Sequence, residues 1–282
     1  MSASLAGPSL RLSALGLAAS AVVLCVVLLA IGGRALVPGD PLAQDLLSIN
    51  REPDALHWLG TDHLGRDVLA RLAAGARLTL LSGVGGALFA FALGAGLTLP
   101  ALALGQPLSG LVFGAFDLLR ALPGVLVAIL LVAALSPGPG AVMLALGLTF
   151  APMVAEVVRG CFAREASADY VAAARVFGLS RLRVAWRHIL PNIAGTLVTM
   201  AAIVLPRCIV TESVLSFLGL GGSPDIPSWG RMIADAAEFA EEAPHAVAVP
   251  VIALSLFTLS LSLLGERIRV MSDPLRRAEA RR

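Results

Sequence analysis

Long apolar runs separated by short polar segments make up most of this chain. Six runs have roughly the length that a helix needs to cross a bilayer, since a hydrocarbon core of about 30 Å takes about 20 residues. They lie at residues 12–31, 78–104, 108–135, 141–158, 193–215 and 246–264. The pattern predicts an all-α polytopic membrane protein with about six transmembrane helices. Almost no residues remain for a soluble domain, so we expect a single transmembrane domain over residues 1–282.

The polar segment between the first two runs, residues 38–77, changes character along its length. Prolines in its first half disfavour a continuous helix there. From Leu64 onwards, apolar side chains recur at helical spacing as far as Ala73, with Arg66 and Arg71 on the opposite face. We therefore expect a short interfacial helix before the second span, and core helices over residues 78–264.

The distribution of charge predicts which side of the membrane each polar segment faces. The chain is 57% hydrophobic and 14% charged, with a mean hydropathy of +0.87, as in integral membrane proteins. Arginines gather in segment 159–192 and in the tail, residues 265–282. By the positive-inside rule both are cytoplasmic, and with six spans so is the N-terminus, residues 1–11. The acidic segment 216–245 and segment 38–77 then lie on the outer side.

Segment 159–192 carries two amphipathic stretches between apolar runs. In the first, Tyr170, Ala173, Ala174 and Phe177 fall at i, i+3, i+4 and i+7. That spacing predicts one face of a helix.

Capping residues set the limits of these two stretches. Ser167 is placed to cap the first helix, and Gly178 to end it in a left-handed conformation. Ser180 is placed to cap a second helix, and Pro191 fits the first turn of the next span. The apolar face of the second helix contains Leu182, Ala185, Trp186, Ile189 and Leu190.

One motif of the segment combines small residues, a glycine and a Leu-Pro pair. Its residues are Asp169, Tyr170, Val171, Ala172, Ala173, Ala174, Gly178, His188, Leu190 and Pro191. This motif resembles the EAA loop of bacterial ABC importer permeases. The resemblance implies a type I importer fold and a coupling helix that sits in a groove of a cytoplasmic ATPase subunit. The family's glutamate is Ala172 here, which affects a salt bridge rather than the shape of the contact.

Further motifs narrow the resemblance to one branch of these permeases. They are His57-Trp58-Leu59-Gly60-Thr61-Asp62-His63-Leu64-Gly65-Arg66-Asp67 with Gly75-Ala76-Arg77, Thr211 to Gly221 with Pro227-Ser228-Trp229-Gly230, and Leu263-Leu264-Gly265-Glu266 with Asp273-Pro274. They are similar to motifs of dipeptide, oligopeptide and nickel importer permeases, and most of all to the dipeptide "C" type. The resemblance covers most of the chain from Leu56 onwards.

The resemblance implies a transport subunit in the bacterial inner membrane rather than an enzyme. Its partners would be a homologous second permease, two cytoplasmic ABC ATPases and an extracytoplasmic solute-binding protein, with no nucleic acid. The chain has no lysine and hence no phosphate-binding Gly-x-x-x-x-Gly-Lys-Ser/Thr loop, so ATP and Mg²⁺ are expected on the ATPase partners and no cofactor on this chain. Di- or oligopeptides are the expected substrate, with nickel or a nickel chelate as the alternative.

Two other classes of membrane protein fit less well. An intramembrane hydrolase needs a constellation such as His-Glu-x-x-His or Gly-x-Ser-x-Gly, and neither motif is present. A secondary transporter needs an ion-coupling site and usually repeated halves, which the sequence does not display.

Several histidines and acids invite a functional interpretation. His57, Asp62, His63 and Asp67 lie close in sequence and raise the idea of a metal site. A tight site needs three or four convergent ligands, whereas a Gly-Thr-Asp segment more simply forms a turn in which the Asp side chain binds backbone amides. We therefore expect no metal there. His188 is expected to pack or dock rather than to act as a base.

Arg207 is the most unusual charge in the chain, because it lies within the fifth apolar run, next to Pro206. Intramembrane charge is costly and needs a partner. We expect Arg207 either to pair with Glu212 or Asp117, or to face the translocation path, where it would attract a peptide carboxylate. Arg207 and Glu212 are thus the candidate residues of that path.

Overall fold

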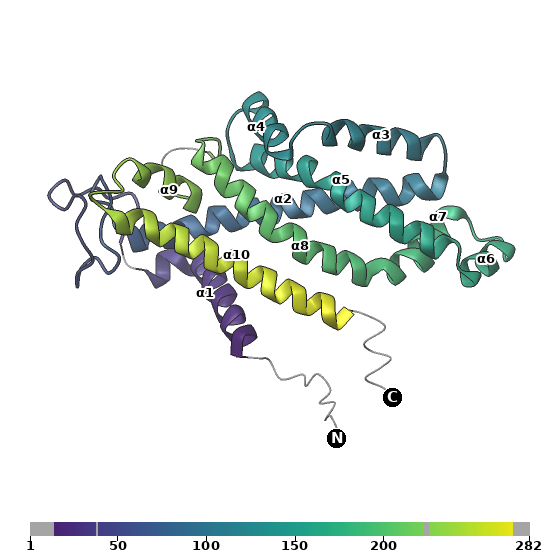
Figure 1. Ribbon diagram of the computed structural model, residues 1–282, viewed down its shortest axis with the longest axis horizontal. Coiled ribbons are helices and arrows are strands. Elements are labelled where there is room, and N and C mark those ends of the chain that lie inside the picture. The colour runs from purple at the N-terminus through teal and green to yellow at the C-terminus, as the bar shows by residue number, and fades with distance from the viewer. Residues whose placement is uncertain (1–13, 38, 223–225, 273–282) are drawn as a thin grey trace, which may run out of the picture.

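The computed structural model describes residues 14–37, 39–222 and 226–272. Its helices are α1 (Ala14–Leu36), α2 (Val68–Leu104), α3 (Leu108–Arg120), α4 (Gly124–Leu135), α5 (Pro139–Ala166), α6 (Asp169–Val176), α7 (Arg181–Val184), the π-helix η1 (Ala185–Ile189), α8 (Leu190–Phe217), α9 (Trp229–Ala237) and α10 (Pro244–Ser272). Within these ranges the only β-structure is an isolated bridge between Thr61 and Asp67. Long helices run side by side along an elongated molecule (Figure 1). The predicted all-α fold is confirmed.

The number of spans depends on one bent helix pair. Over the described residues, five helices are long and apolar enough to cross a membrane, and α3 with α4 makes a sixth if the pair is one span. We expected an unbroken helix over 108–135, but the axis turns by 95° between α3 and α4. The bend falls at Pro123, which disfavours a helical conformation in the residue before it. The predicted continuous helix over 108–135 is therefore wrong: this part of the chain forms two helices.

Two predicted helices are continuous with transmembrane helices. The interfacial helix expected from Leu64 does not exist as a separate element, because α2 begins at Val68 and continues to Leu104. Asp67 fixes this start by accepting a hydrogen bond from Ala70 N at 2.8 Å. At the other end, α7 runs through η1 into α8 without a break. The wide π turn lies just before Pro191, which has no N–H to donate within a helix.

Helices α2 and α5 form the centre of the bundle through small residues. A Cβ atom on Gly94 would lie 2.6 Å from Ala151 O, and one on Gly147 would lie 2.5 Å from Phe89 Cβ. Such close approach is how transmembrane helices gain packing energy in lipid, where burial of apolar surface alone gives none. The core around this contact includes Leu146 and Val154.

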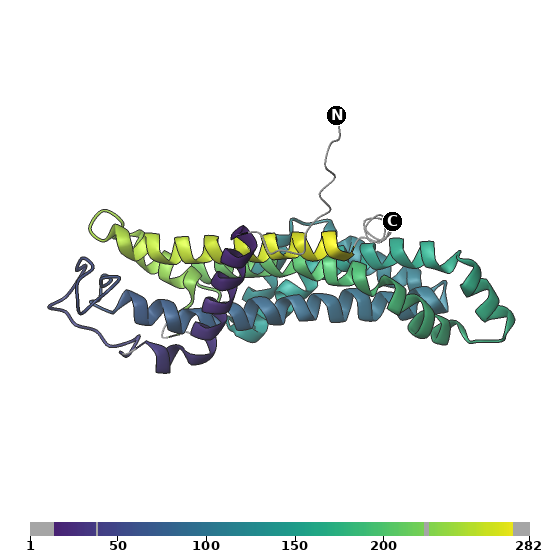
Figure 2. The same cartoon turned by 90° about the horizontal axis from the view of Figure 1, so that it is seen from below.

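The two ends of the bundle carry different structures. Segment 39–67 and α9 lie at one end, and α6 with α7 lies at the other (Figure 1). Helix α1 crosses the bundle obliquely, as Figure 2 shows. The segments expected on opposite sides of the membrane are thus at opposite ends, while their sidedness stays a prediction. The predicted N-terminal segment 1–11, Asp273-Pro274 and the rest of the tail from residue 273 lie outside the described residues.

Candidate functional site

The predicted coupling loop has a small apolar core of its own. Val171 and Ala174 of α6 are buried against Val184, Ile189 and Ile193 from the elements that follow. Cys161 of α5 completes this cluster. Helix α6 is therefore fixed to both α5 and the start of α8.

The predicted apolar face of α6 is buried only at Ala174. Phe177 is 83% exposed and Val176 is 85% exposed, while Ala172 and Ala173 are also exposed. Helix α6 has only two turns and ends at Val176, so Phe177 lies past its end instead of one turn further along the buried face. The second predicted face is wrong in part: Ala185 and Ile189 are buried, whereas Leu182 and Trp186 are largely exposed.

The capping predictions for the loop have mixed outcomes. Gly178 has a φ of +75°, as predicted, and Leu179 N donates to Ala174 O across the turn. Ser180 caps α7 by accepting from Arg183 N at 3.4 Å. The prediction for Ser167 is wrong: it ends α5, and its hydroxyl donates to Arg164 O, so Ala168 precedes α6 instead.

A hydrogen-bonded group joins the loop to two transmembrane helices. Tyr170 donates to Glu165 Oε2 at 2.7 Å. Asn192 Nδ2 donates to Tyr170 Oη at 3.0 Å and to His188 O at 2.8 Å. Partial burial and the bond to Glu165 raise the pKa of Tyr170. Sequence patterns did not single out Glu165, since an acid at the end of a helix has no distinctive spacing.

The remaining loop residues lie where the helices join. Asp169 is the first residue of α6 and is exposed. Leu190 and Pro191 are the first two residues of α8, so the predicted place of Pro191 in a first turn is confirmed, although η1 precedes it. The ring centroid of His188 lies 6.5 Å from that of Tyr170.

At the opposite end, Asp62 is at the centre of a buried ion network. Its carboxylate accepts from Leu64 N at 2.9 Å and Arg66 N at 3.0 Å, as predicted for a turn, and it also contacts both Arg66 Nε, at 2.8 Å, and Arg71. Asp235 of α9 joins the same network through Arg71 Nη2 at 2.9 Å. Burial opposes ionisation of Asp62, but Arg71, the two amides and Arg66 outweigh it and hold its pKa below the ordinary value.

The two histidines of this end have partners of other kinds. His57 Nδ1 lies 2.9 Å from Asp67 Oδ2, and the ring of His63 stacks on Phe239 at 4.6 Å. Burial lowers the pKa of His63. In the part of the chain that the structure describes, no three His, Cys, Asp or Glu side chains are grouped as metal ligands would be.

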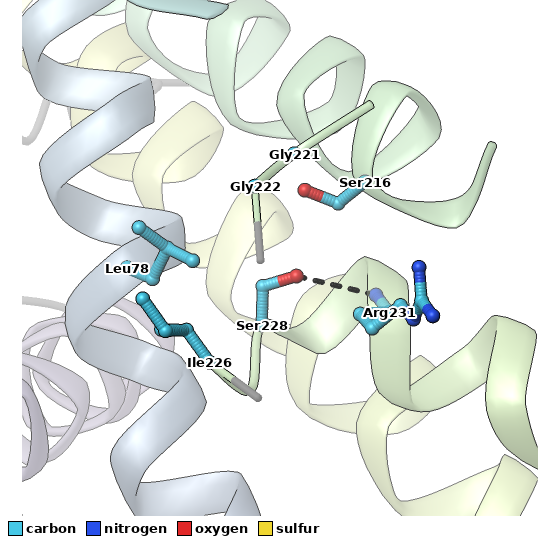
Figure 3. Close-up of a pocket in the computed structure, with 7 residues that line it drawn as sticks. All are labelled: Leu78, Ser216, Gly221, Gly222, Ile226, Ser228 and Arg231. Carbon is cyan, nitrogen blue, oxygen red and sulfur yellow. Dashed lines mark hydrogen bonds between the residues drawn. The ribbon is translucent and has the colours of Figure 1, made fainter. Parts of the chain in front are cut away.

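The motif that ends at Gly75-Ala76-Arg77 packs against the motif Pro227-Ser228-Trp229-Gly230. Trp229 Nε1 donates to Leu72 O at 2.9 Å, and a Cβ on Gly75 would lie 3.2 Å from the Trp229 ring. Close to this contact is a crevice of about 10 Å³ (Figure 3). Its lining includes Ser228, which caps α9 by accepting from Arg231 N. The crevice has room for about one water, so it is too small for a substrate.

Arg207 and Glu212, the two candidate residues of the translocation path, lie on different sides of α8. Glu212 is 1% exposed and is bonded by Ser216 at 2.7 Å and Ser213 at 3.3 Å, so it is sealed within the bundle. Arg207 is exposed on the other side of α8, in a groove of about 780 Å³ between α5, α8 and α10. The expected pairing of Arg207 with Glu212 or Asp117 is wrong for this structure, because no salt bridge joins them in the described residues.

Comparisons with known proteins agree with this geometry. The profile of the family described as "Binding-protein-dependent transport system inner membrane component" matches residues 89–278. A "Probable peptide ABC transporter permease protein y4tQ" of Sinorhizobium fredii is 37% identical over 85% of this chain and 82% of its own length. A "Glutathione transport system permease protein GsiD" of Pectobacterium atrosepticum is 33% identical over 91% of this chain and 86% of its own.

The fold also matches that of a solved importer. A chain of the MetNI methionine ABC transporter, in a structure of inward-facing conformations, aligns with a TM-score of 0.60 at 18% identity. The alignment covers 72% of this chain and 96% of that one. Family membership favours an importer permease over the secondary-transporter and hydrolase alternatives. The chain belongs to the family of binding-protein-dependent transport system inner membrane components, and it is a multi-pass permease subunit of the ABC importer class.

Proposed function

We propose that this chain forms half of the translocation path of a binding-protein-dependent importer for di- or oligopeptides in the bacterial inner membrane. ATP and Mg²⁺ are bound by two ATPase partners, one of which docks on the coupling loop of this chain. A homologous permease forms the other half of the path, and a solute-binding protein delivers the cargo. The observation that carries the proposal is the exposed apolar tip of α6.

The tip of α6 has the properties of a docking surface. Val176 and Phe177 are more than four-fifths exposed at the end of the molecule, beside the exposed methyl groups of Ala172 and Ala173. Large apolar side chains that stay exposed on a rigid base are typical of interaction sites. Gly178 then turns the chain directly behind Phe177. A partner can therefore contact the small side chains closely and enclose Phe177.

The base of α6 is suited to transmit force from such a partner. The core of the loop and the hydrogen bonds of Tyr170 connect α6 with α5 and α8 at the same time. A displacement of α6 would move both helices together, because packed interiors deform little. ATP-driven closure of the ATPase partners would in this way exchange inward-open and outward-open arrangements of the helices.

The names of the relatives favour peptides over nickel as the cargo. One relative is named for a peptide and another for glutathione, which is itself a peptide. The solute-binding protein is expected to make the first selection. A nickel importer remains the alternative that experiment must separate from this one.

The docking surface is tested by a Phe177→Asp replacement. Phe177 contributes little to the fold because it is exposed, so the variant should insert and fold normally. Co-purification of the ATPase subunits and peptide uptake should both be lost, since a carboxylate cannot be buried in an apolar groove without a partner. Leu47→Asp is the matched control, because Leu47 is 98% exposed at the opposite end. Retention of the ATPases by Phe177→Asp would exclude this docking surface.

The substrate is tested with the whole transporter in nanodiscs. ATP hydrolysis is measured with the binding protein encoded beside the chain, loaded with short peptides or with nickel. Stimulation by peptides alone is expected. Stimulation by nickel alone would replace the peptide proposal with the nickel alternative.

A further inference from the structure

Arg207 is a charged residue within α8, which is part of a candidate membrane span. Ten residues separate Arg207 from the end of α8 at Phe217, which corresponds to about 15 Å along the helix. That distance is about half the thickness of a hydrocarbon core, and α8 belongs to a stretch long and apolar enough to cross a membrane. A charge within such a stretch is costly unless water, a counter-ion or a cavity receives it.

No such counter-ion is found in the described residues. The closest polar contact of Arg207 is with Met153 Sδ, 3.5 Å from Nη1. Glu212 is bonded to hydroxyl groups elsewhere, and Asp117 lies 3.9 Å from Arg120. The positive charge of Arg207 thus remains without a neutralising carboxylate in the described part of the chain.

The groove around Arg207 contains hydroxyl groups that can accept hydrogen bonds. Thr258 donates its proton to Leu254 O at 2.8 Å, and Ser262 donates to Thr258 O at 2.8 Å. Their oxygens keep lone pairs for N–H donors. Thr211 and Ser255 also line the groove. The guanidinium of Arg207 could therefore bind one end of a ligand, while these hydroxyl oxygens accept hydrogen bonds from another part of it.

We propose that the Arg207 groove binds the carboxylate of a passing peptide, while the hydroxyls of α10 accept hydrogen bonds from its N–H groups. This inference rests on the proposed function, because it assumes peptide cargo. A guanidinium offers two parallel donors to a carboxylate, and the open groove around it, of about 780 Å³, has room for a short peptide. Apolar side chains such as Phe150 and Leu259 provide the rest of the wall and tolerate varied side chains.

The first test uses the complete transporter in proteoliposomes with the binding protein and a labelled peptide. Arg207→Gln should lower uptake about tenfold or more, the loss expected when a charged hydrogen-bonded pair is removed. Arg207→Lys should retain only part of the uptake, because it keeps the charge but not the two parallel donors. Val198→Ala, exposed on α8 outside the groove, should change uptake little. Basal ATP hydrolysis and co-purification of the second permease should stay unchanged in all three. Loss of the second permease from Arg207→Gln would overturn the proposal, because Arg207 would then bind that subunit.

The second test varies the charge at one position. Arg207→Cys is prepared in a background without Cys25, Cys161 and Cys208, and is modified with methanethiosulfonate reagents that carry an ammonium, a methyl or a sulfonate group. Uptake should rise with the ammonium, stay low with the methyl and fall further with the sulfonate, as expected for an anionic cargo. Val198→Cys, exposed on α8 but outside the groove, is the control. An order independent of charge would overturn the proposal.

Uptake by the wild-type complex distinguishes a failure of the proposed function from a failure of the carboxylate site. If the complex takes up no peptide, the proposed function fails and the carboxylate site fails with it. If it takes up peptide but the Arg207 variants behave like wild type, only the carboxylate site is overturned.

Discussion

The two ends of this permease both expose large apolar side chains, but in the described residues only one of them contains a buried network of ion pairs. At the end formed by segment 39–67 and α9, charged side chains are buried and neutralised within the chain, as Asp62 is by Arg66 and Arg71. At the end formed by α6 and α7, apolar side chains such as Phe177 remain exposed. A buried ion network that neutralises itself holds the surrounding segments in place, whereas an exposed apolar side chain, such as Phe177 at one end or Leu47 at the other, can contact a partner. The comparison indicates a structural role for the Asp62 network of the first end, while docking at the tip of α6 at the second end stays a proposal.

The largest expected effect comes from removing a charge at the self-contained end. Asp62→Asn leaves two buried arginines short of one carboxylate, and loss of one partner from a buried pair costs about 3–5 kcal/mol. The midpoint of thermal unfolding in nanodiscs should fall markedly. Asp54→Asn, which removes the exposed contact with Arg51, should leave it unchanged. Equal midpoints for the two variants would contradict the structural role of the network.

A smaller effect is expected at the docking end, from Gly178→Val. A left-handed backbone costs about 1–2 kcal/mol for a residue with a Cβ, although nothing lies within 4 Å of the space a Cβ would take. The turn should shift, with the result that peptide-stimulated ATP hydrolysis falls while the unfolding midpoint changes little. Gly178→Asn is the matched control, because asparagine tolerates this conformation better. If the valine and asparagine variants lose the same activity, backbone conformation is not the cause.

How much of this contrast the sequence reveals depends on the range of the interactions. Gly178, Ser180 and the Asp62 turn were predicted because glycine conformation, caps and Asx turns are local. The contact of Arg71 with Asp235 was not, since 164 residues separate the two and no spacing links them. The exposure of Phe177 was also missed, because a two-turn helix gives too few residues for its periodicity to identify the buried face. The bend between α3 and α4 was missed as well, although Pro123 gives a local signal for it.

Acidification should lower the unfolding midpoint gradually through residues of the end formed by segment 39–67 and α9. The pKa of Asp62 is lowered in the folded state, so its stabilising contribution is complete above the ordinary value of 3.8 and is lost as pH falls through the folded pKa. The pKa of His63 is also lowered, so its contribution is present above the ordinary value of 6.5 and declines as pH falls below it. The unfolding midpoint of the wild type should decrease as pH falls from about 7.5 to about 4, a range in which His63 loses its contribution while Asp62 stays ionised. The decrease should be smaller in His63→Gln. If this variant has the same pH profile of unfolding midpoints as the wild type, His63 does not contribute to the pH dependence.

The smallest expected effect, from Tyr170→Phe, examines how the docking end is joined to the bundle. The variant loses the hydrogen bonds to Glu165 and Asn192 but keeps the ring, and a neutral hydrogen bond contributes about 0.5–1.5 kcal/mol, less where water reaches it. The unfolding midpoint should hardly move. Peptide-stimulated ATP hydrolysis should fall relative to basal hydrolysis, because α6 is then held to α5 and α8 by its apolar core alone. Asn192→Ala should reproduce that change, since it removes the same connection from the side of α8. If both variants keep full stimulation, the apolar core of the loop transmits the motion without help, and the hydrogen bonds serve only to orient Tyr170.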